Sequence, residues 1–162
     1  MQFFIQMQEE TLKPVRILYM RRTGAYGAEN AALMQRWKEW LEGHGLFDED
    51  SVILAIPMDD PTLTKPDQCR YDVSIIAKEI QAEGEGIFCR ELPGGKYVVF
   101  LIEHTAQAIK AAWSGYFEEL QRNGYHLDNS RPVMERYAKH LVKRHLCELC
   151  VPVEMDLSAL TM

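Results

Sequence analysis

Glu135 and Tyr137 are the two side chains whose types and spacing best suit a chemical role. They lie in the segment Val133-Met-Glu-Arg-Tyr137, and if this segment is a β-strand, residues two apart point to the same face. A carboxylate among apolar and aromatic groups is costly to bury unpaired, so it binds a cation, pairs with an arginine or takes up a proton. A surface carboxylate, or an ion pair with Arg136 or Lys139, is the alternative interpretation.

The other residues that could do chemistry are four cysteines and five scattered histidines. Cys147 and Cys150 fall in a stretch that we interpret as a strand, where residues three apart point to opposite faces. Cys69 and Cys89 do not supply a second close pair, so we expect buried thiols, no metal site and no cofactor. No Ser–His–Asp or Cys–His arrangement and no phosphate-binding glycine loop is evident, which favours a binding protein over an enzyme.

Two segments have the apolar periodicity of amphipathic helices. Residues 28–44 and 105–123 place apolar side chains three and four apart, and each is followed by a glycine. Runs rich in β-branched and apolar residues predict strands at 14–22, 52–57, 69–76, 86–92, 96–103, 133–137 and 146–153. Near-helical spacing also continues from Met134 to His145, so residues 138–145 are open to either a loop or a partly helical interpretation.

The predicted order strand–helix–strand–strand occurs twice, in residues 14–80 and 86–154. Leu41 and Gly45 in the first half match Leu120 and Gly124 in the second, which favours a duplication over chance similarity between two units. We therefore predict a single domain over residues 1–162 with two similar halves.

The longest predicted strands are apolar on both faces. In the first half, Ile17 and Tyr19 alternate with Leu18 and Met20. One helix per half can cover only one face, so the second face needs the partner half, a second protein or a ligand.

The composition is that of an ordinary globular domain, with 47% hydrophobic and 26% charged residues. A net charge of -6 argues against direct nucleic-acid binding, which needs a cationic face. The start of the chain lacks the basic and long apolar regions of a signal peptide, and no apolar run approaches the ~20 residues of a membrane span. We expect a cytoplasmic protein without nucleic-acid or membrane partners.

Several motifs resemble the GyrI-like small-molecule-binding domain. They are Asp67-Gln-Cys-Arg-Tyr-Asp72, Leu92-Pro-Gly-Gly-Lys-Tyr-Val-Val-Phe100, Trp113…Phe117…Gly124-Tyr125, Pro132-Val-Met-Glu-Arg-Tyr137 and Cys150-Val-Pro-Val-Glu154. This domain occurs alone in DNA gyrase inhibitory proteins and as the effector-binding domain of AraC-type and MerR-type multidrug regulators. The resemblance implies an α+β fold of duplicated strand–helix–strand–strand modules with pseudo-twofold symmetry, antiparallel sheets and helices on one face. No helix-turn-helix segment precedes Pro14, so we expect a standalone binding domain.

The resemblance also implies a ligand groove between the halves with Glu135 at its floor. An aromatic-walled groove with one carboxylate suits a lipophilic cation, because the rings offer apolar area and quadrupole attraction. The candidate ligand-binding residues are Glu135, Tyr137, Trp113, Tyr71, Tyr19 and Phe100. For each aromatic side chain, ordinary core packing is the alternative.

Two departures from the family's usual pattern concern the rim of this groove. Thr105-Ala-Gln-Ala108 replaces a Gly-Pro-Tyr-like turn, and the stretch after Tyr137 is shorter and basic. Our leading hypothesis is a protein that binds or sequesters a lipophilic or cationic small molecule. The alternatives are a modulator of a protein partner such as DNA gyrase, and a hydrolase of electrophilic small molecules that uses Glu135 and Tyr137.

Overall fold

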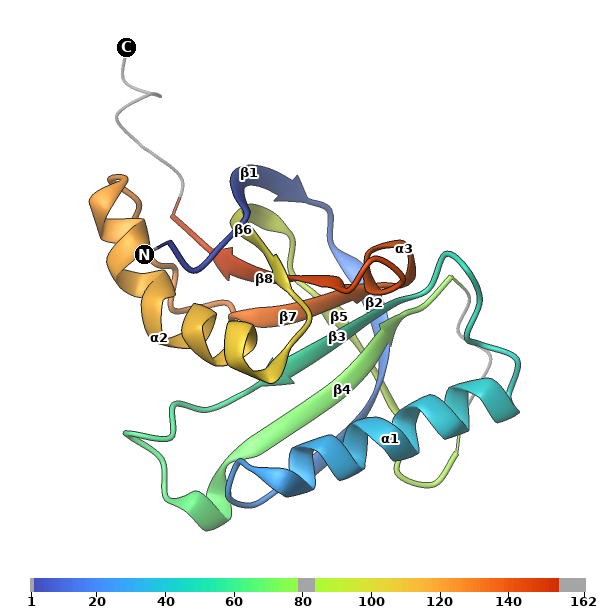
Figure 1. Cartoon of the computed structure of the whole chain (residues 1–162). Coiled ribbons are helices and arrows are strands. Elements are labelled where there is room, and N and C mark those ends of the chain that lie inside the picture. Colours follow the sequence, from blue (N-terminus) through green and yellow to red (C-terminus); the bar gives the residue numbers. More distant parts are fainter. Residues whose placement is uncertain (1, 79–83, 155–162) are drawn as a thin grey trace.

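The computed structural model describes residues 2–78 and 84–154, and its main feature is one eight-stranded antiparallel sheet (Figure 1). The strands are β1 (Gln6–Leu12), β2 (Val15–Thr23), β3 (Val52–Pro57), β4 (Arg70–Ile76), β5 (Phe88–Leu92), β6 (Gly95–Glu103), β7 (Met134–Ala138) and β8 (Leu146–Pro152). The helices are α1 (Ala28–Gly43), α2 (Ala106–Arg122) and α3 (Lys139–Val142), with one 3-10 turn, η1 (Pro66–Gln68). The α+β prediction is confirmed.

The order of the strands shows the duplication. The sheet runs β1-β6-β8-β7-β3-β4-β2-β5, which reads the same when the half containing α1 is exchanged with the half containing α2. The pseudo-twofold axis therefore passes between β3 and β7. The outermost strands are exchanged between the halves, because β1 pairs with β6 and β5 pairs with β2.

The sequence prediction omitted β1, and this is a correction to the repeat. Each half is strand–strand–helix–strand–strand, with β1 and β5 in equivalent places. The residues of β1, Gln-Met-Gln-Glu-Glu-Thr-Leu, lack the apolar run that marks a buried strand. Polar and charged residues are common on edge strands because they discourage pairing with other molecules, so this strand carries little sequence signal.

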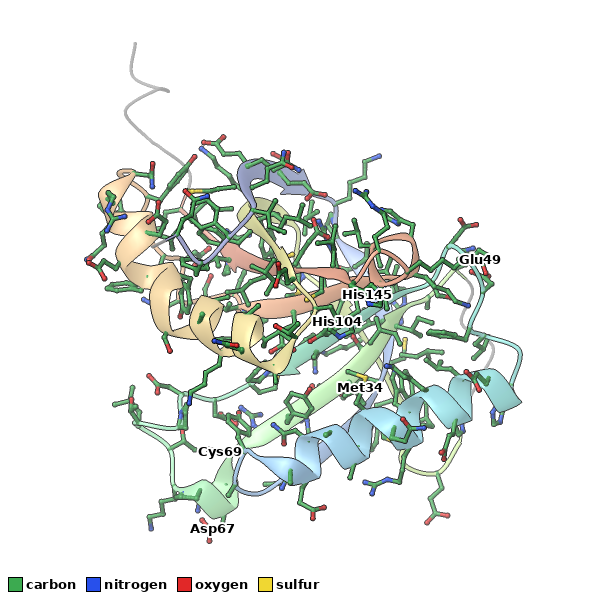
Figure 2. The ribbon with its side chains drawn as sticks, viewed as in Figure 1. Met34, Glu49, Asp67, Cys69, His104 and His145 are labelled. Atoms are coloured by element: carbon green, nitrogen blue, oxygen red, sulfur yellow. The ribbon has the colours of Figure 1, made fainter. Side chains whose placement is uncertain are left out.

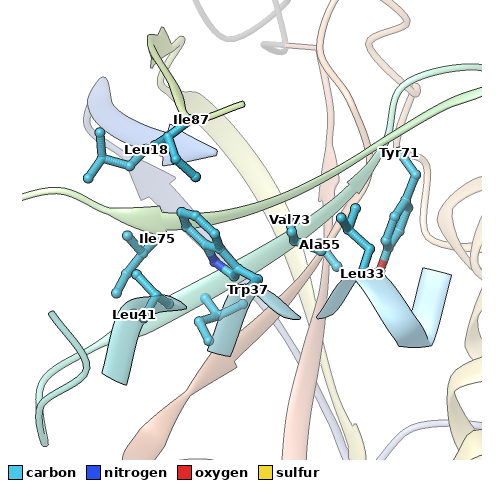
Figure 3. Close-up of a cluster of buried hydrophobic side chains, with 10 residues drawn as sticks. Leu18, Leu33, Trp37, Leu41, Ala55, Tyr71, Val73, Ile75 and Ile87 are labelled. Carbon is cyan, nitrogen blue, oxygen red and sulfur yellow. The ribbon is translucent and has the colours of Figure 1, made fainter. Parts of the chain in front are cut away.

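Both long helices cover the same face of the sheet (Figure 1). Helix α1 packs on β2 and β4 through Leu33, Trp37 and Leu41, which recur every four residues and form one buried stripe. Figure 3 shows this cluster under α1. Helix α2 packs on β6 and β8 over a second cluster, and its first turn is capped by Thr105, whose Oγ1 accepts a 3.0 Å hydrogen bond from the Ala108 amide.

The second face of the sheet is covered largely by the sheet itself, which curls into a half-barrel. A third buried cluster fills this concave face with residues from both halves, among them Ile17, Leu54, Tyr97 and Met134. The sequence left open whether the partner half, a second protein or a ligand covers the second face. The partner half covers the part of it that this cluster fills.

The stretch after Tyr137 is part strand and part helix. Strand β7 ends at Ala138 and the short α3 follows at once, so the helical interpretation of part of residues 138–145 is correct. Cys147 and Cys150 lie in clusters on opposite faces of β8, as predicted, whereas Cys89 is only half-buried rather than buried. Among the helices of residues 2–78 and 84–154, none combines the length and apolar character that a membrane crossing requires.

Candidate functional site

Glu135 lies on β7, near the middle of the helix-bearing face of the sheet. Helix α2 covers strands β8 and β6, which lie on one side of β7. Helix α1 covers strands β4 and β2, which lie on the other side of β7, beyond β3. In the register between β7 and β3, Glu135 stands opposite Ala55. The carboxylate therefore sits close to the pseudo-twofold axis, between the two areas that the helices cover.

Two neutral donors hold the carboxylate. The indole Nε1 of Trp113, on α2, donates to Oε2 at 2.6 Å, and the hydroxyl of Tyr137 donates to Oε1. Glu135 is half-buried, yet it has no ion pair with any residue in the described part of the chain. The Glu135 side chain is thus fixed by hydrogen bonds from neutral groups and has no cationic partner in the part of the chain that the structure describes.

The two cations that sequence reasoning offered as partners are engaged elsewhere. Arg136 points to the concave face, where its guanidinium pairs with Glu10 at 2.8 Å and Glu148 at 2.9 Å. Lys139 lies over the ring of Phe47 at 4.3 Å from its centroid. The alternative of an ion pair between Glu135 and either residue is therefore wrong.

Aromatic rings surround the carboxylate. Tyr137 packs against both helix-side clusters, and its ring lies 5.1 Å from that of His104, centroid to centroid. Burial raises the pKa of the Tyr137 hydroxyl, and the charge of Glu135 raises it further; the same two causes, in that order, raise the pKa of Tyr71. Both phenols therefore keep their protons at neutral pH, and Tyr137 stays a donor.

Two further ionisable groups near the site, Cys147 and His104, have pKa values shifted toward their neutral forms. Burial, with the charges of Glu135 and Glu148, raises the pKa of the Cys147 thiol to about 12. Burial, with the charges of Lys38 and His145, lowers the pKa of His104. Neither group supplies a positive charge to pair with Glu135.

Four of the six predicted ligand-binding residues come together. Glu135, Tyr137 and Trp113 are in direct contact, and Tyr71, buried under α1, is close enough for the charge of Glu135 to affect its pKa. Their role in binding stays a prediction.

Tyr19 and Phe100 are corrections to this set. Tyr19 shares a face of β2 with Ile17 and packs on the concave side, where Arg90 lies 4.4 Å from its ring centroid. Phe100 is fully buried beneath Phe3 and Phe4. Tyr19 was assigned from residue type, whereas the alternation of the strand places it on the other face. Phe100 does share the face of Glu135, since both stand opposite Leu149, but its burial leaves no surface for a ligand.

Sequence reasoning missed several neighbours of the site. Tyr116 lies one helical turn after Trp113, and their rings meet edge to face at 6.0 Å. His104 and Met34 lie in the region between α2 and α1 (Figure 2). The three-residue spacing from Trp113 was the available signal for Tyr116; His104 precedes the first turn of α2 and belonged to no periodic pattern.

Tyr26, in the loop between β2 and α1, has a structural role beside the site. The Tyr26 hydroxyl donates to the Arg70 carbonyl at 2.6 Å and accepts from the Asp59 amide at 3.2 Å. Its ring meets Tyr71 edge to face at 6.3 Å. Tyr26 therefore holds the connection between β3 and β4 against the wall that Tyr71 forms.

Comparison with protein families agrees with the resemblance that the sequence motifs showed. The model of the GyrI-like small molecule binding domain matches residues 5–154. The chain belongs to the GyrI-like family. The duplicated fold agrees with what the sequence motifs implied for a member of this family, whereas the ligand groove with Glu135 at its floor stays a prediction.

Relatives of this GyrI-like protein include regulators and gyrase inhibitors. It is 40% identical, over 90% of its length and 97% of the relative's, to the SPbeta prophage-derived protein YosT of Bacillus subtilis, whose name describes a candidate transcriptional regulator. It is 29% identical to a DNA gyrase inhibitor of Pectobacterium carotovorum, over 72% of this chain and 76% of that one.

Two solved structures share the fold at low sequence identity. The C-terminal domain of EcmrR superposes with a TM-score of 0.71 at 12% identity, over 93% of this chain and 98% of that domain; the chain spans 58% of the longer EcmrR chain seen in a complex with DNA. SAV2435 bound to tetraphenylphosphonium superposes with a TM-score of 0.59 at 13% identity, over 93% and 94% of the two chains.

Within residues 2–78 and 84–154, no three His, Cys, Asp or Glu side chains are grouped to hold a metal ion.

Proposed function

We propose that this GyrI-like protein binds a lipophilic organic cation against Glu135, in the cytoplasm. The observation that carries the proposal is the half-buried carboxylate held by Trp113 and Tyr137 and paired with no cation of the described residues. A partly buried charge without a counter-ion is costly. A cationic ligand removes that cost when it binds, so the site gains more from a cation than from a neutral molecule of the same shape.

The hydrogen bonds to Glu135 make the site ready for such a ligand. Each carboxylate oxygen already accepts one hydrogen bond from a neutral group, so the side chain keeps one orientation and neither donor brings a positive charge that would compete with a cationic ligand. The nearby rings of Tyr137 and Trp113 add apolar area and the attraction of their π faces for a cation. The tetraphenylphosphonium bound to SAV2435, a protein of the same fold, is a molecule of this class and supports the proposal.

Hydrolysis by Glu135 and Tyr137 is a second candidate function. A carboxylate that activates water needs a free lone pair, and Glu135 keeps such lone pairs because each oxygen accepts one hydrogen bond of the two that it can accept; hydrolysis ranks second because the bound ligand of SAV2435 points to binding. A protein partner such as DNA gyrase is supported by the name of the Pectobacterium relative and by the acidity of the chain. Ligand binding and a partner are compatible, since a bound ligand can alter a surface that a partner reads.

The proposal is tested with two ions of nearly the same shape and opposite charge. Tetraphenylphosphonium should raise the melting temperature of the protein and bind in calorimetry, because a ligand of the native state stabilises it by mass action. Tetraphenylborate should bind at least tenfold more weakly. Glu135→Gln should weaken tetraphenylphosphonium binding by about tenfold or more, which corresponds to roughly 1.4 kcal/mol.

The matched control is Glu49→Gln, which removes an exposed carboxylate beside α3 and should leave both affinities unchanged. Equal binding of the two ions, or unaltered binding by Glu135→Gln, would overturn the proposal. Turnover of an electrophilic substrate that is lost in Glu135→Gln would favour the hydrolase instead.

A further inference from the structure

The concave face of the sheet contains a cavity of about 520 Å³ that is separate from the Glu135 site. Its wall includes Arg136, the next residue after Glu135, and since neighbouring residues of a strand point to opposite faces, the sheet itself separates the two places. The third hydrophobic cluster fills the remainder of this face. The cavity is thus the part of the second face that the curled sheet leaves unfilled.

We propose that this cavity binds a second class of ligand, an unbranched aliphatic chain that ends in one carboxylate. Its volume lies in the range of ordinary small-molecule sites. The lining contains no Phe, Tyr or Trp among the described residues, and its apolar part is aliphatic: Val52, Ile76, Val99, Leu101, Ala138 and Leu141. A flexible alkyl chain can fill such a surface, whereas a planar or rigid aromatic ion would find no ring to stack on.

The charged residues in the floor of the cavity are already paired with one another. Arg136 donates to both Glu148 and Glu10, and Glu148 and Arg136 are largely buried. Because each of these carboxylates already accepts hydrogen bonds from the guanidinium, neither resembles the unpaired Glu135. The floor therefore offers no free anion to attract a cationic ligand.

The mouth of the cavity has the opposite character. Its exposed lining includes His140, in α3, and Arg144, just after it, and Arg144 forms no ion pair within the described residues. An exposed guanidinium next to an aliphatic hollow can bind a carboxylate through paired hydrogen bonds. A chain with one terminal carboxylate places its apolar part against the aliphatic wall and its charge beside Arg144.

Decanoate tests this proposal, with two probes of the same chain length and different head groups. By calorimetry below the micellar concentration, decanoate should bind at least tenfold more tightly than decanol or decyltrimethylammonium. Arg144→Glu should weaken decanoate binding by tenfold or more. Lys110→Glu makes the same change of charge at an exposed position on α2, away from the cavity lining, and should leave the affinity unchanged.

Two further measurements separate this site from the Glu135 site. Leu101→Trp should fill the cavity and abolish decanoate binding while the variant keeps its response to tetraphenylphosphonium, which shows that it is folded. Glu135→Gln should leave decanoate binding unchanged. The inference is wrong if decanoate does not bind, if its affinity survives Arg144→Glu, or if it competes with tetraphenylphosphonium for one site; none of these results alters the test of Glu135 with the two tetraphenyl ions.

Discussion

Glu135 and Arg136 are neighbours on one strand, but the two faces of the sheet surround their side chains with different partners. On the helix-bearing face, Glu135 receives two hydrogen bonds from neutral groups and meets no cation of the described residues. On the concave face, Arg136 is bound by Glu148 and Glu10. The two environments differ although the two residues are adjacent in β7, because their side chains point to opposite faces of the sheet.

The concave face pairs its buried charges in both halves of the molecule. Asp72 is fully buried and pairs with Arg21 at 2.6 Å and Arg90 at 2.5 Å. Asp72 is the third residue of β4 and Glu148 the third residue of β8, which are equivalent strands of the repeat. The duplicated fold thus places one acid on this face in each half and supplies arginine to both, which indicates a structural role. Glu135, on the helix-bearing face, has no such arginine partner among the described residues, and the proposed cationic ligand rests on this difference.

The largest expected effect comes from removing Arg136, one of the arginines of the concave face. Arg136→Met leaves the Glu148 carboxylate buried without its partner, so we expect the free energy of unfolding to fall by about 3–5 kcal/mol. Glu135→Gln removes a charge that has no ionic partner, so we expect a change within about 1 kcal/mol of zero. Urea denaturation of the two variants and the parent protein measures both values.

A double variant sharpens this comparison. Replacing the acid as well, in Arg136→Met with Glu148→Leu, should recover part of the lost stability, because a buried ion pair can be exchanged for apolar side chains at little cost. If Glu135→Gln proved as destabilising as Arg136→Met, the two faces would not differ in the way described, and Glu135 would have a structural role.

A smaller loss of stability is expected from changes at Tyr137, which lies between the areas of the sheet covered by α1 and α2. Its ring packs against the cluster under α1 and the cluster under α2, and its hydroxyl binds Glu135. Tyr137→Ala should destabilise the protein by about 2–4 kcal/mol through the lost packing, and Tyr137→Phe by about 1 kcal/mol through the lost hydrogen bond.

The same pair of variants separates packing from binding. Tyr137→Phe keeps the ring, so thermal denaturation should change little while the affinity for tetraphenylphosphonium changes through the altered hydrogen bonding of Glu135. Equal losses of stability in Tyr137→Ala and Tyr137→Phe would show that the ring does not join the two clusters.

The contrast between the two faces was only partly predictable from the sequence. Helix α1 and strand β6 carry periodic apolar patterns, and their boundaries follow from those patterns within one or two residues. Strand β1 has no such pattern, because its partner β6 lies far along the chain and its exposed edge is polar. Pairings between distant strands depend on the whole sheet and not on local sequence.

The candidate site shows the same division. Glu135 and Tyr137 could be placed on one face from their spacing of two along a strand. The direction of Arg136 follows from the same rule, but its partners Glu10 and Glu148 could not be found because Glu10 lies on the strand that the pattern did not reveal. Tyr19 failed because residue type alone does not say which face of a strand is covered by a helix, and Phe100, on the correct face, failed because residue type does not say how deeply a ring is buried.

The smallest expected effect concerns the thiols, which report on burial at both faces. Cys147 lies on the helix-bearing face and Cys150 on the concave face, and burial, the largest cause for each, raises both pKa values to about 12. At pH 8 the thiolate of either is then roughly one part in ten thousand, against about a tenth for a thiol whose pKa is 9. In the folded protein an aromatic disulfide reagent should therefore label the half-buried Cys89 quickly and the three buried thiols slowly, with all four labelled at one rate in urea.

The raised thiol pKa values also predict the effect of alkaline pH. In the unfolded chain these thiols lose their protons near pH 9, and in the folded protein only near pH 12. The folded state therefore binds more protons in that interval, and the free energy of unfolding should fall as the pH rises through it.

A cation bound at Glu135 should slow labelling of Cys147 and leave Cys150 unchanged, because only Cys147 shares the face of that carboxylate. Equal protection of both thiols would show that the ligand stabilises the whole fold without a preference for either face.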